Sequence, residues 1–356
     1  MSIQESAHSA AAAIAARVSE DANADSLTTL EAAVKAYSDA KGRIGKAGAA
    51  ERLGLKEQEL VFFEKVFREA GRRSNGEPEG VHARQRDIAC LRLISWAETI
   101  NSRNDDWQIP VDLGGDPSEE RARAQVRAVE LLLRALITES YKSQDALVER
   151  LGGLFKASVV DKWKKSGDKG DILSGTLFSE LASLFVNKQE FGRYTELLES
   201  DGHLVFLKDR RKTSQDFLED IRRMRNAVAH NKSLSTAQLQ LLNLYFEDLT
   251  TPLQGAFDRG DSQVNPDDYL EATPAELASY FKDLQEDVLD IKDDIADLQD
   301  ALGATEEKVR GLQGGVLTIV SSILVFGVFM VLHLKDWNAM AATAGPETIE
   351  WLTQRS

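Results

Sequence analysis

The chain has 356 residues, 42% of them hydrophobic, and a formal net charge of −15. This length and composition are typical of a folded protein with more than one packed unit, and they exclude a disordered chain. The acidic balance argues against a protein that binds nucleic acid over its whole surface, so any RNA site has to be a local basic island.

The cysteine content also limits the chemistry. Cys90 is the only cysteine, which excludes an intramolecular disulfide framework and fits a reducing, cytosolic environment. No Cys/His cluster has the spacing of metal ligands, and we therefore expect no metal and no cofactor.

The N-terminal stretch, MSIQESAHSAAAAIAARVSE, lacks the basic start and the strongly apolar centre of a secretory signal, so we expect it in the cytosol. Helical periodicity predicts a helical N-terminal domain over residues 1–110. We expect this domain to sense a signal. The segment AAERLGLKEQEL, residues 49–60, resembles a helix-turn-helix, but Glu57, Glu59 and Glu64 would repel phosphate. A structural or protein-binding role is therefore favoured over DNA reading.

Helical periodicity continues to residue 250, and no run alternates as a strand would, which predicts an all-α fold. Within it, residues 208–232 carry eight basic and four acidic side chains, a net of +4 in an acidic protein. This segment is the local basic island that the charge balance requires. The residues expected to bind RNA there are Arg210, Arg211, Lys212, Arg222 and Arg223.

The basic island contains the stretch RRMRNAVAHN, residues 222–231. At 100° per residue, Arg222, Asn226 and His230 form one row on an exposed polar edge, with Arg225 beside it. The opposite side is a core stripe formed by Phe217, Ile221, Met224 and Val228.

A polar row of this kind can cleave RNA without a protein nucleophile. The 2′-hydroxyl of RNA attacks the neighbouring phosphate when a histidine takes its proton, and the 5′-oxygen leaves with a proton from an acid. An arginine can neutralise the charge that develops on the phosphate. Asparagine can orient either group by hydrogen bonding.

The Arg-Asn-x3-His spacing of Arg225, Asn226 and His230 resembles the signature of the HEPN superfamily, and a softer similarity to abortive-infection members covers residues 120–257. The resemblance implies an all-α bundle, here residues 118–257, that dimerises and joins two motifs across a cleft. In many members this site cuts RNA without a metal, so Arg225, Asn226 and His230 are the expected catalytic residues. Some HEPN domains are non-catalytic, and a histidine at a helix C-terminus can simply cap carbonyls. A non-enzymatic adaptor that binds RNA or a protein therefore stays an alternative, and a trigger or antidote protein is a possible further partner.

Apolar residues keep heptad spacing from Leu277 to Leu312, with β-branched residues prominent at the a positions. This pattern predicts a parallel two-stranded coiled coil over residues 275–313 and hence a homodimer. A helix that packs back onto its own domain is the alternative.

Residues 316–334, VLTIVSSILVFGVFMVLHL, contain no Lys, Arg, Asp or Glu and are long enough to cross a bilayer. We predict a single transmembrane helix here, with a buried core helix as the alternative, followed by a short tail over residues 335–356. A weak excess of basic residues before the span places the N-terminal domains in the cytosol.

Overall fold

The computed structural model describes residues 1–19, 23–74, 81–105, 107–111, 113, 119–168, 170–198, 209–230 and 232–284. These residues form helices joined by turns and loops, with an isolated bridge between Asp168 and Asp171. The predicted all-α fold is confirmed for this part of the chain. It divides into two compact units, one of Met1–Ala122 with Ser233–Glu247, the other of Arg123–Lys232 with the residues from Asp248 onward.

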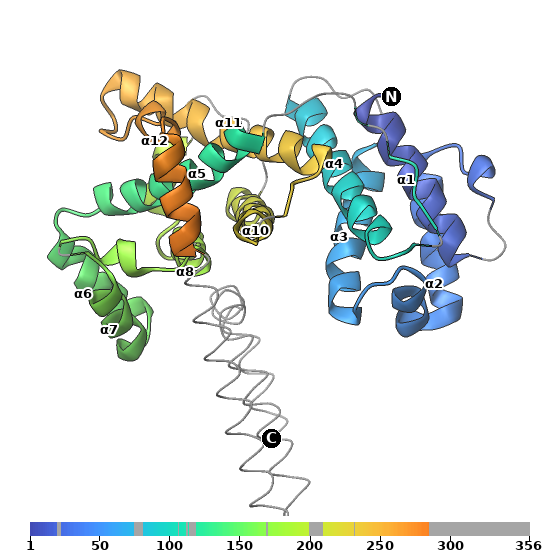
Figure 1. Ribbon diagram of the computed structural model, residues 1–356, viewed down its shortest axis with the longest axis horizontal. Coiled ribbons are helices and arrows are strands. Elements are labelled where there is room, and N and C mark those ends of the chain that lie inside the picture. Colours follow the sequence, from blue (N-terminus) through green and yellow to red (C-terminus); the bar gives the residue numbers. More distant parts are fainter. Residues whose placement is uncertain are drawn as a thin grey trace, which may run out of the picture. The chain divides into compact units, whose positions relative to one another are not determined.

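The first unit is built from the N-terminal helices (Figure 1). Ser2 and Glu5 close a capping box at the first helix, and Thr29 caps the second. Four aromatic rings, those of Tyr37, Phe63, Phe67 and Trp96, form the centre of its core, with centroids 5.1 to 6.1 Å apart in edge-to-face or stacked pairs. Its helices are α1 (Ile3–Val18), the 3-10 turn η1 (Ala24–Ser26), α2 (Leu30–Arg52), α3 (Glu57–Arg73) and α4 (Val81–Asn101).

A tight turn joins α2 to α3 where the sequence resembles a helix-turn-helix. Gly54 takes a φ of 63° in this turn, a conformation that glycine adopts without steric cost. The buried carboxylate of Glu64 accepts a hydrogen bond from Tyr37 at 3.1 Å and pairs with Lys41 at 2.6 Å. Glu64, one of the acidic residues of α3, is therefore bound within its own unit, which agrees with a structural role.

The carboxylate of Glu59 joins the start of α3 to the end of α4. It accepts two hydrogen bonds from Arg103, at 2.7 and 2.9 Å, and one from the backbone N–H of Lys56 at 2.9 Å. The hydrogen bonds from Arg103 are the main reason why the pKa of Glu59 falls to about 2. Because the folded-state pKa is lowered, the ionised carboxylate stabilises the fold above its unfolded pKa of about 4.3. This contribution is lost as the pH falls from there toward the folded-state value.

We expect Glu59→Gln to lower the melting temperature of the full chain near neutral pH. The difference from the wild type should shrink as the pH falls from about 4 toward 2, because the carboxylate gains its proton first in the unfolded state and near pH 2 in the folded state as well. Thermal unfolding followed by circular dichroism across this range measures the difference. Glu57→Gln, an exposed change in the same helical turn, is the control. A difference in melting temperature that stays constant down to about pH 2 would contradict the lowered pKa of Glu59.

Helix α11 (Thr236–Arg259) contributes to both units. In the first unit, Glu98 of α4 accepts hydrogen bonds from the side chain of Ser235 and the backbone of Ala237, at the start of α11. Arg84 of α4 donates to the carbonyl of Leu244, 160 residues away, at 2.9 Å. These long-range contacts bind the start of α11 to the N-terminal helices, and the domain limits of 1–110 and 118–257 stay predictions from the sequence.

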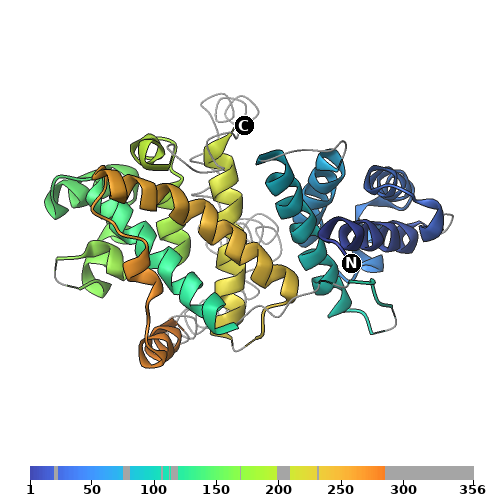
Figure 2. The same cartoon turned by 90° about the horizontal axis from the view of Figure 1, so that it is seen from above.

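The second unit contains the remaining helices. Its α10 is seen end-on in Figure 1 and along its length in Figure 2. A further helix covers residues 274–284. The others are α5 (Glu119–Glu139, within the unit from Arg123), α6 (Gln144–Leu154), α7 (Ala157–Ser166), the 3-10 turn η2 (Ile172–Gly175), α8 (Phe178–Phe185), α9 (Gly192–Leu198), α10 (Arg210–Ala229) and α12 (Asp267–Leu270).

The start of the predicted coiled coil is helical but packs inside its own chain. Leu277, Phe281 and Leu284, the first three members of the heptad seam, are 7%, 5% and 3% exposed. The guanidinium of Arg123 lies 5.5 Å from the centroid of the Phe281 ring. For these residues intramolecular contacts bury the apolar face, as in the alternative of a helix that packs back onto its own domain. The inter-chain coiled coil from residue 275 stays a prediction.

The rest of the predicted coiled coil, residues 285–313, lies outside the described residues, as do the predicted span at 316–334 and the tail at 335–356. Among the helices that the structure does describe, we find none that combines the length and the apolar character needed to cross a membrane. The coil, the span and the tail therefore stay predictions from the sequence.

Candidate active site

The motif stretch lies at the C-terminal end of α10. Asp209 caps the start of this helix by accepting a hydrogen bond from the backbone N–H of Lys212 at 3.1 Å. His230 follows the last helical residue as the C-cap. The predicted core stripe is confirmed, because all four of its members are buried: Phe217, Ile221, Met224 and Val228.

Arg225 is buried as well, and this corrects the prediction that it lies on the exposed polar edge. The residue is 7% exposed. It follows Phe217 and Ile221 in steps of four residues, so its side chain continues the buried row of α10 rather than the polar row of Arg222. A projection of α10 at 100° per residue could not reveal that a neighbouring helix supplies a negative charge beside Arg225.

The counter-charge of Arg225 is Glu130 of α5, itself 2% exposed. One carboxylate oxygen, Oε2, accepts hydrogen bonds from Nε and Nη2 of Arg225, both at 2.9 Å. The same oxygen accepts the hydroxyl proton of Tyr280 at 2.5 Å, and the Tyr280 oxygen accepts from Arg225 Nε at 3.2 Å. Three polar groups from distant parts of the sequence thus form one closed network.

Aromatic rings and a second arginine complete this network. The Arg225 guanidinium carbon lies 5.6 Å from the ring centroid of Phe178 and 5.9 Å from that of Tyr280. Arg134, one turn after Glu130 in α5, pairs with the other carboxylate oxygen at 2.6 Å. Burial alone would lower the pKa of Arg225, but Glu130 and Tyr280 outweigh it and raise the pKa. Arg225 is therefore charged, and it shares the single negative charge of Glu130 with Arg134.

Two other arginines of α10 share the carboxylate of Glu219. Arg222 binds both of its oxygens at 2.8 Å, and Arg223 binds one of them at 3.2 Å. Burial raises the pKa of Glu219, but the hydrogen bonds and charges of the two arginines lower it below its usual range. The side chains of Arg222 and Arg223 are 31% and 36% exposed, so solvent and ligands can reach them.

Asn226 and His230 occupy the polar row as predicted. Asn226 is half-buried and His230 is exposed. The backbone N–H of His230 donates to the carbonyl of Asn226 at 3.1 Å, so the last turn of the helix holds both residues. The arrangement places an accessible imidazole one turn beyond a half-exposed amide and two turns beyond an accessible guanidinium.

Comparison with known families shows to which family the chain belongs. Residues 2–266 match the family model described as STY4199-like HEPN. The chain belongs to this HEPN family. The match begins in α1, so the N-terminal helices fall inside the family region, whereas the similarity read from the motif began near residue 120. No match was found among curated proteins or among solved structures.

The three basic residues at the N-terminal end of α10 differ in their exposure to solvent. Arg210 and Arg211 are half-buried, and Lys212 is exposed. Arg211 donates to the carbonyl of Val186 at 3.3 Å and so helps to hold the segment after α8. These residues start the helix that carries Arg225, Asn226 and His230 at its far end, and none of the contacts above joins the two ends.

Glu130 and Tyr280 are the site residues that the motif did not predict. One signal was available for Glu130, since it lies in the apolar stretch VELLLR of the HEPN domain with Arg134 one turn later. A charged pair within a core helix indicates a buried partner. Tyr280 had no comparable signal, because its neighbours Leu277, Phe281 and Leu284 follow the heptad pattern.

We next considered metal ligands and the cysteine thiol among the residues that the structure describes. Within these residues, no group of three or more His, Cys, Asp or Glu side chains is arranged to hold a metal ion. The thiol of Cys90 is 1% exposed, and burial raises its pKa to about 12. Such a thiol is inert as a nucleophile near neutral pH.

Proposed function

We propose that this HEPN protein is an endoribonuclease that arrests growth, as a toxin or as an anti-phage abortive-infection effector. One observation carries the proposal: His230 of the Arg-Asn-x3-His motif is exposed at the end of α10, in one row with Asn226 and Arg222. Membership of a HEPN family supports the same reading. An exposed imidazole next to hydrogen-bonding and cationic groups is the minimum that RNA self-cleavage chemistry requires.

The roles follow from the chemistry of each side chain. His230 takes the proton from the 2′-hydroxyl or gives one to the leaving 5′-oxygen, and Asn226 orients the imidazole or the phosphate. Arg222 is partly exposed and can exchange the carboxylate of Glu219 for a phosphate oxygen. Arg225 is the motif residue proposed to neutralise the phosphate, which it can do only after its present carboxylate partner is displaced or uncovered.

The direct experiment is incubation of the full-length protein with a defined RNA in excess chelator. Cleavage that leaves 2′,3′-cyclic phosphate ends is the expected result, because the nucleophile is the RNA's own hydroxyl. The matched substrate with 2′-O-methyl groups should stay intact. Cleavage of that substrate, or of DNA, would reject the mechanism.

A second candidate is the non-catalytic adaptor. The buried, ion-paired state of Arg225 favours the adaptor, because this is the environment of a structural arginine. The adaptor predicts that the same assay shows retained RNA or protein binding without new RNA ends. The ribonuclease predicts new ends that depend on His230.

Membrane anchoring and dimerisation are proposed from the sequence. The apolar stretch of residues 316–334 would anchor the chain, and the heptads of residues 285–313 would pair two copies. Two membrane-bound copies would meet at a high effective concentration, which favours a cleft shared by two motifs. Extraction of membranes with alkaline carbonate tests the anchor: a protein that leaves the membrane fraction is not spanning it.

A further inference from the structure

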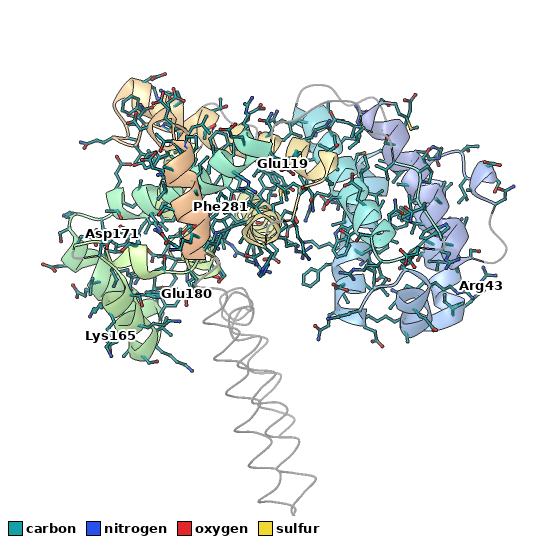
Figure 3. All side chains as sticks on the ribbon, in the orientation of Figure 1. Arg43, Glu119, Lys165, Asp171, Glu180 and Phe281 are labelled. Atoms are coloured by element: carbon teal, nitrogen blue, oxygen red, sulfur yellow. The ribbon has the colours of Figure 1, made fainter. Side chains whose placement is uncertain are left out.

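The helix of residues 274–284 lies against α5 (Figure 1), and Phe281 is labelled on it in Figure 3. Its apolar side is buried through Leu277, Phe281 and Leu284. Its polar contribution is Tyr280, which reaches both Glu130 and Arg225. The helix that leads toward the predicted coil is thereby attached to the motif arginine.

Tyr280 forms one wall of a closed environment around Arg225. Its hydroxyl binds both members of the ion pair, and its ring faces the guanidinium from 5.9 Å. The ring of Phe178 forms another wall at 5.6 Å, and the Arg225 side chain is left 9% exposed. An RNA phosphate cannot reach this guanidinium in the closed environment, and Glu130 already occupies it as its ion-pair partner.

The three groups around Arg225 differ in how they are attached. Glu130 and Phe178 belong to α5 and α8, helices of the bundle itself. Tyr280 belongs to a separate helix that follows residues 271–273, which have no regular secondary structure. Movement of this helix would remove one wall while leaving α5, α8 and α10 in place.

The apolar face of this helix has two possible uses that exclude each other. Leu277, Phe281 and Leu284 are buried in their own chain, yet they also occupy d, a and d of the heptad pattern that continues to Leu312. If a second copy paired along the whole heptad pattern, it would need the same side chains. A coil that extends to Leu277 therefore requires the helix, and Tyr280 with it, to leave Arg225.

We propose that the helix of residues 274–284 is a latch that keeps Arg225 closed, and that pairing with a second copy of this chain along the heptads releases it. This inference rests on the proposed ribonuclease function, whose regulation it describes. In the closed form, Tyr280 covers the guanidinium and helps Glu130 to hold it. In the open form, the phosphate of RNA can compete with Glu130 for Arg225. The latch thus has two states, and dimerisation favours the open one.

The test measures the accessibility of Arg225 separately from catalysis. Full-length protein in detergent is treated with phenylglyoxal, which modifies accessible arginines, and labelling of the Arg225 peptide is quantified by mass spectrometry. The same samples are assayed for RNA cleavage. Tyr280→Ala removes the ring and the hydroxyl, and Tyr280→Phe keeps the packing but removes the hydrogen bonds. Tyr269→Ala and Tyr269→Phe in α12 of the same unit are matched controls.

We expect Tyr280→Ala to raise the labelling rate of Arg225 about tenfold, because the covering ring and the hydrogen bonds to two charged groups are lost together. Tyr280→Phe should give a smaller rise, and the Tyr269 variants none. RNA cleavage should increase in the same order. Tyr280→Phe also keeps the test valid if Tyr280→Ala fails to fold.

Two results would overturn the latch. In the first, labelling of Arg225 stays at the wild-type rate in both Tyr280 variants. In the second, labelling rises but a wild-type cleavage activity is lost, which would make Tyr280 a residue that positions Arg225 for catalysis. A rise in labelling with no RNA cleavage in any sample, wild type included, would support the latch as a conformational device and reject the ribonuclease.

Discussion

Replacement of His230 by alanine is expected to reduce RNA cleavage by about 10²- to 10⁴-fold, the range that a positioned acid or base contributes. The fold should stay intact, because the imidazole is exposed and the contact that fixes this residue is its backbone N–H to Asn226. Rates of RNA cleavage by the full chain, measured together with its circular dichroism spectrum, test both parts. Asn226→Ala should reduce the rate less, since an orienting hydrogen bond is lost rather than the proton carrier.

His82→Ala is the matched control for His230→Ala. His82 is also exposed on a helix, but it lies in α4 of the other unit and outside the motif. Its loss should leave the cleavage rate unchanged. If His230→Ala cuts RNA as fast as the wild type, the ribonuclease proposal fails and the adaptor is left.

Replacement of Glu130 by alanine is expected to destabilise the protein by about 3–5 kcal/mol, the usual cost of removing one partner of a buried ion pair. Arg225 would keep its positive charge in a site where its side chain is 9% exposed, and Arg134 would lose the same partner. Equilibrium unfolding of the full chain in guanidinium chloride measures the change. Hydrogen exchange in α5 and α10 shows whether the loss is located in the second unit.

Glu219→Ala is the contrasting variant. Its carboxylate also binds two arginines, but all three side chains are about a third exposed. Exposed pairs contribute about 0–1 kcal/mol, so the expected loss is small. If Glu130→Ala and Glu219→Ala lower the free energy of unfolding equally, burial of the Arg225 network does not increase the cost of removing its carboxylate.

Much of the second unit could be predicted from periodicity. The core stripe of α10 is predictable because an amphipathic helix has to turn its apolar residues inward whatever it packs against. The same holds for the exposed position of His230, which lies at the helix end. Arg225 could not be placed in this way, because it borders the apolar face and its burial depends on Glu130, 95 residues earlier in the chain.

The division of the chain into two units could not be predicted from the sequence either. Helix α11 has one continuous apolar period, so the sequence offers no reason to divide it. Its first half joins the N-terminal helices because Arg84 and Glu98 of α4 bind it. The packed structure determines which groups meet when they are this far apart in the sequence.

The sequence by itself determined the all-α class, the position of the motif on one helix and the accessible histidine, because helical period and residue type are local properties. It also predicts a coil and a membrane span, which depend on the heptads and apolar run beyond residue 284. Only the tertiary structure decided that Arg225 is held by Glu130 and Tyr280, and that Leu277, Phe281 and Leu284 are buried in their own chain. The physical reason is that an apolar face or a charge in a sequence specifies the kind of partner it needs, while the fold brings one particular partner within contact distance.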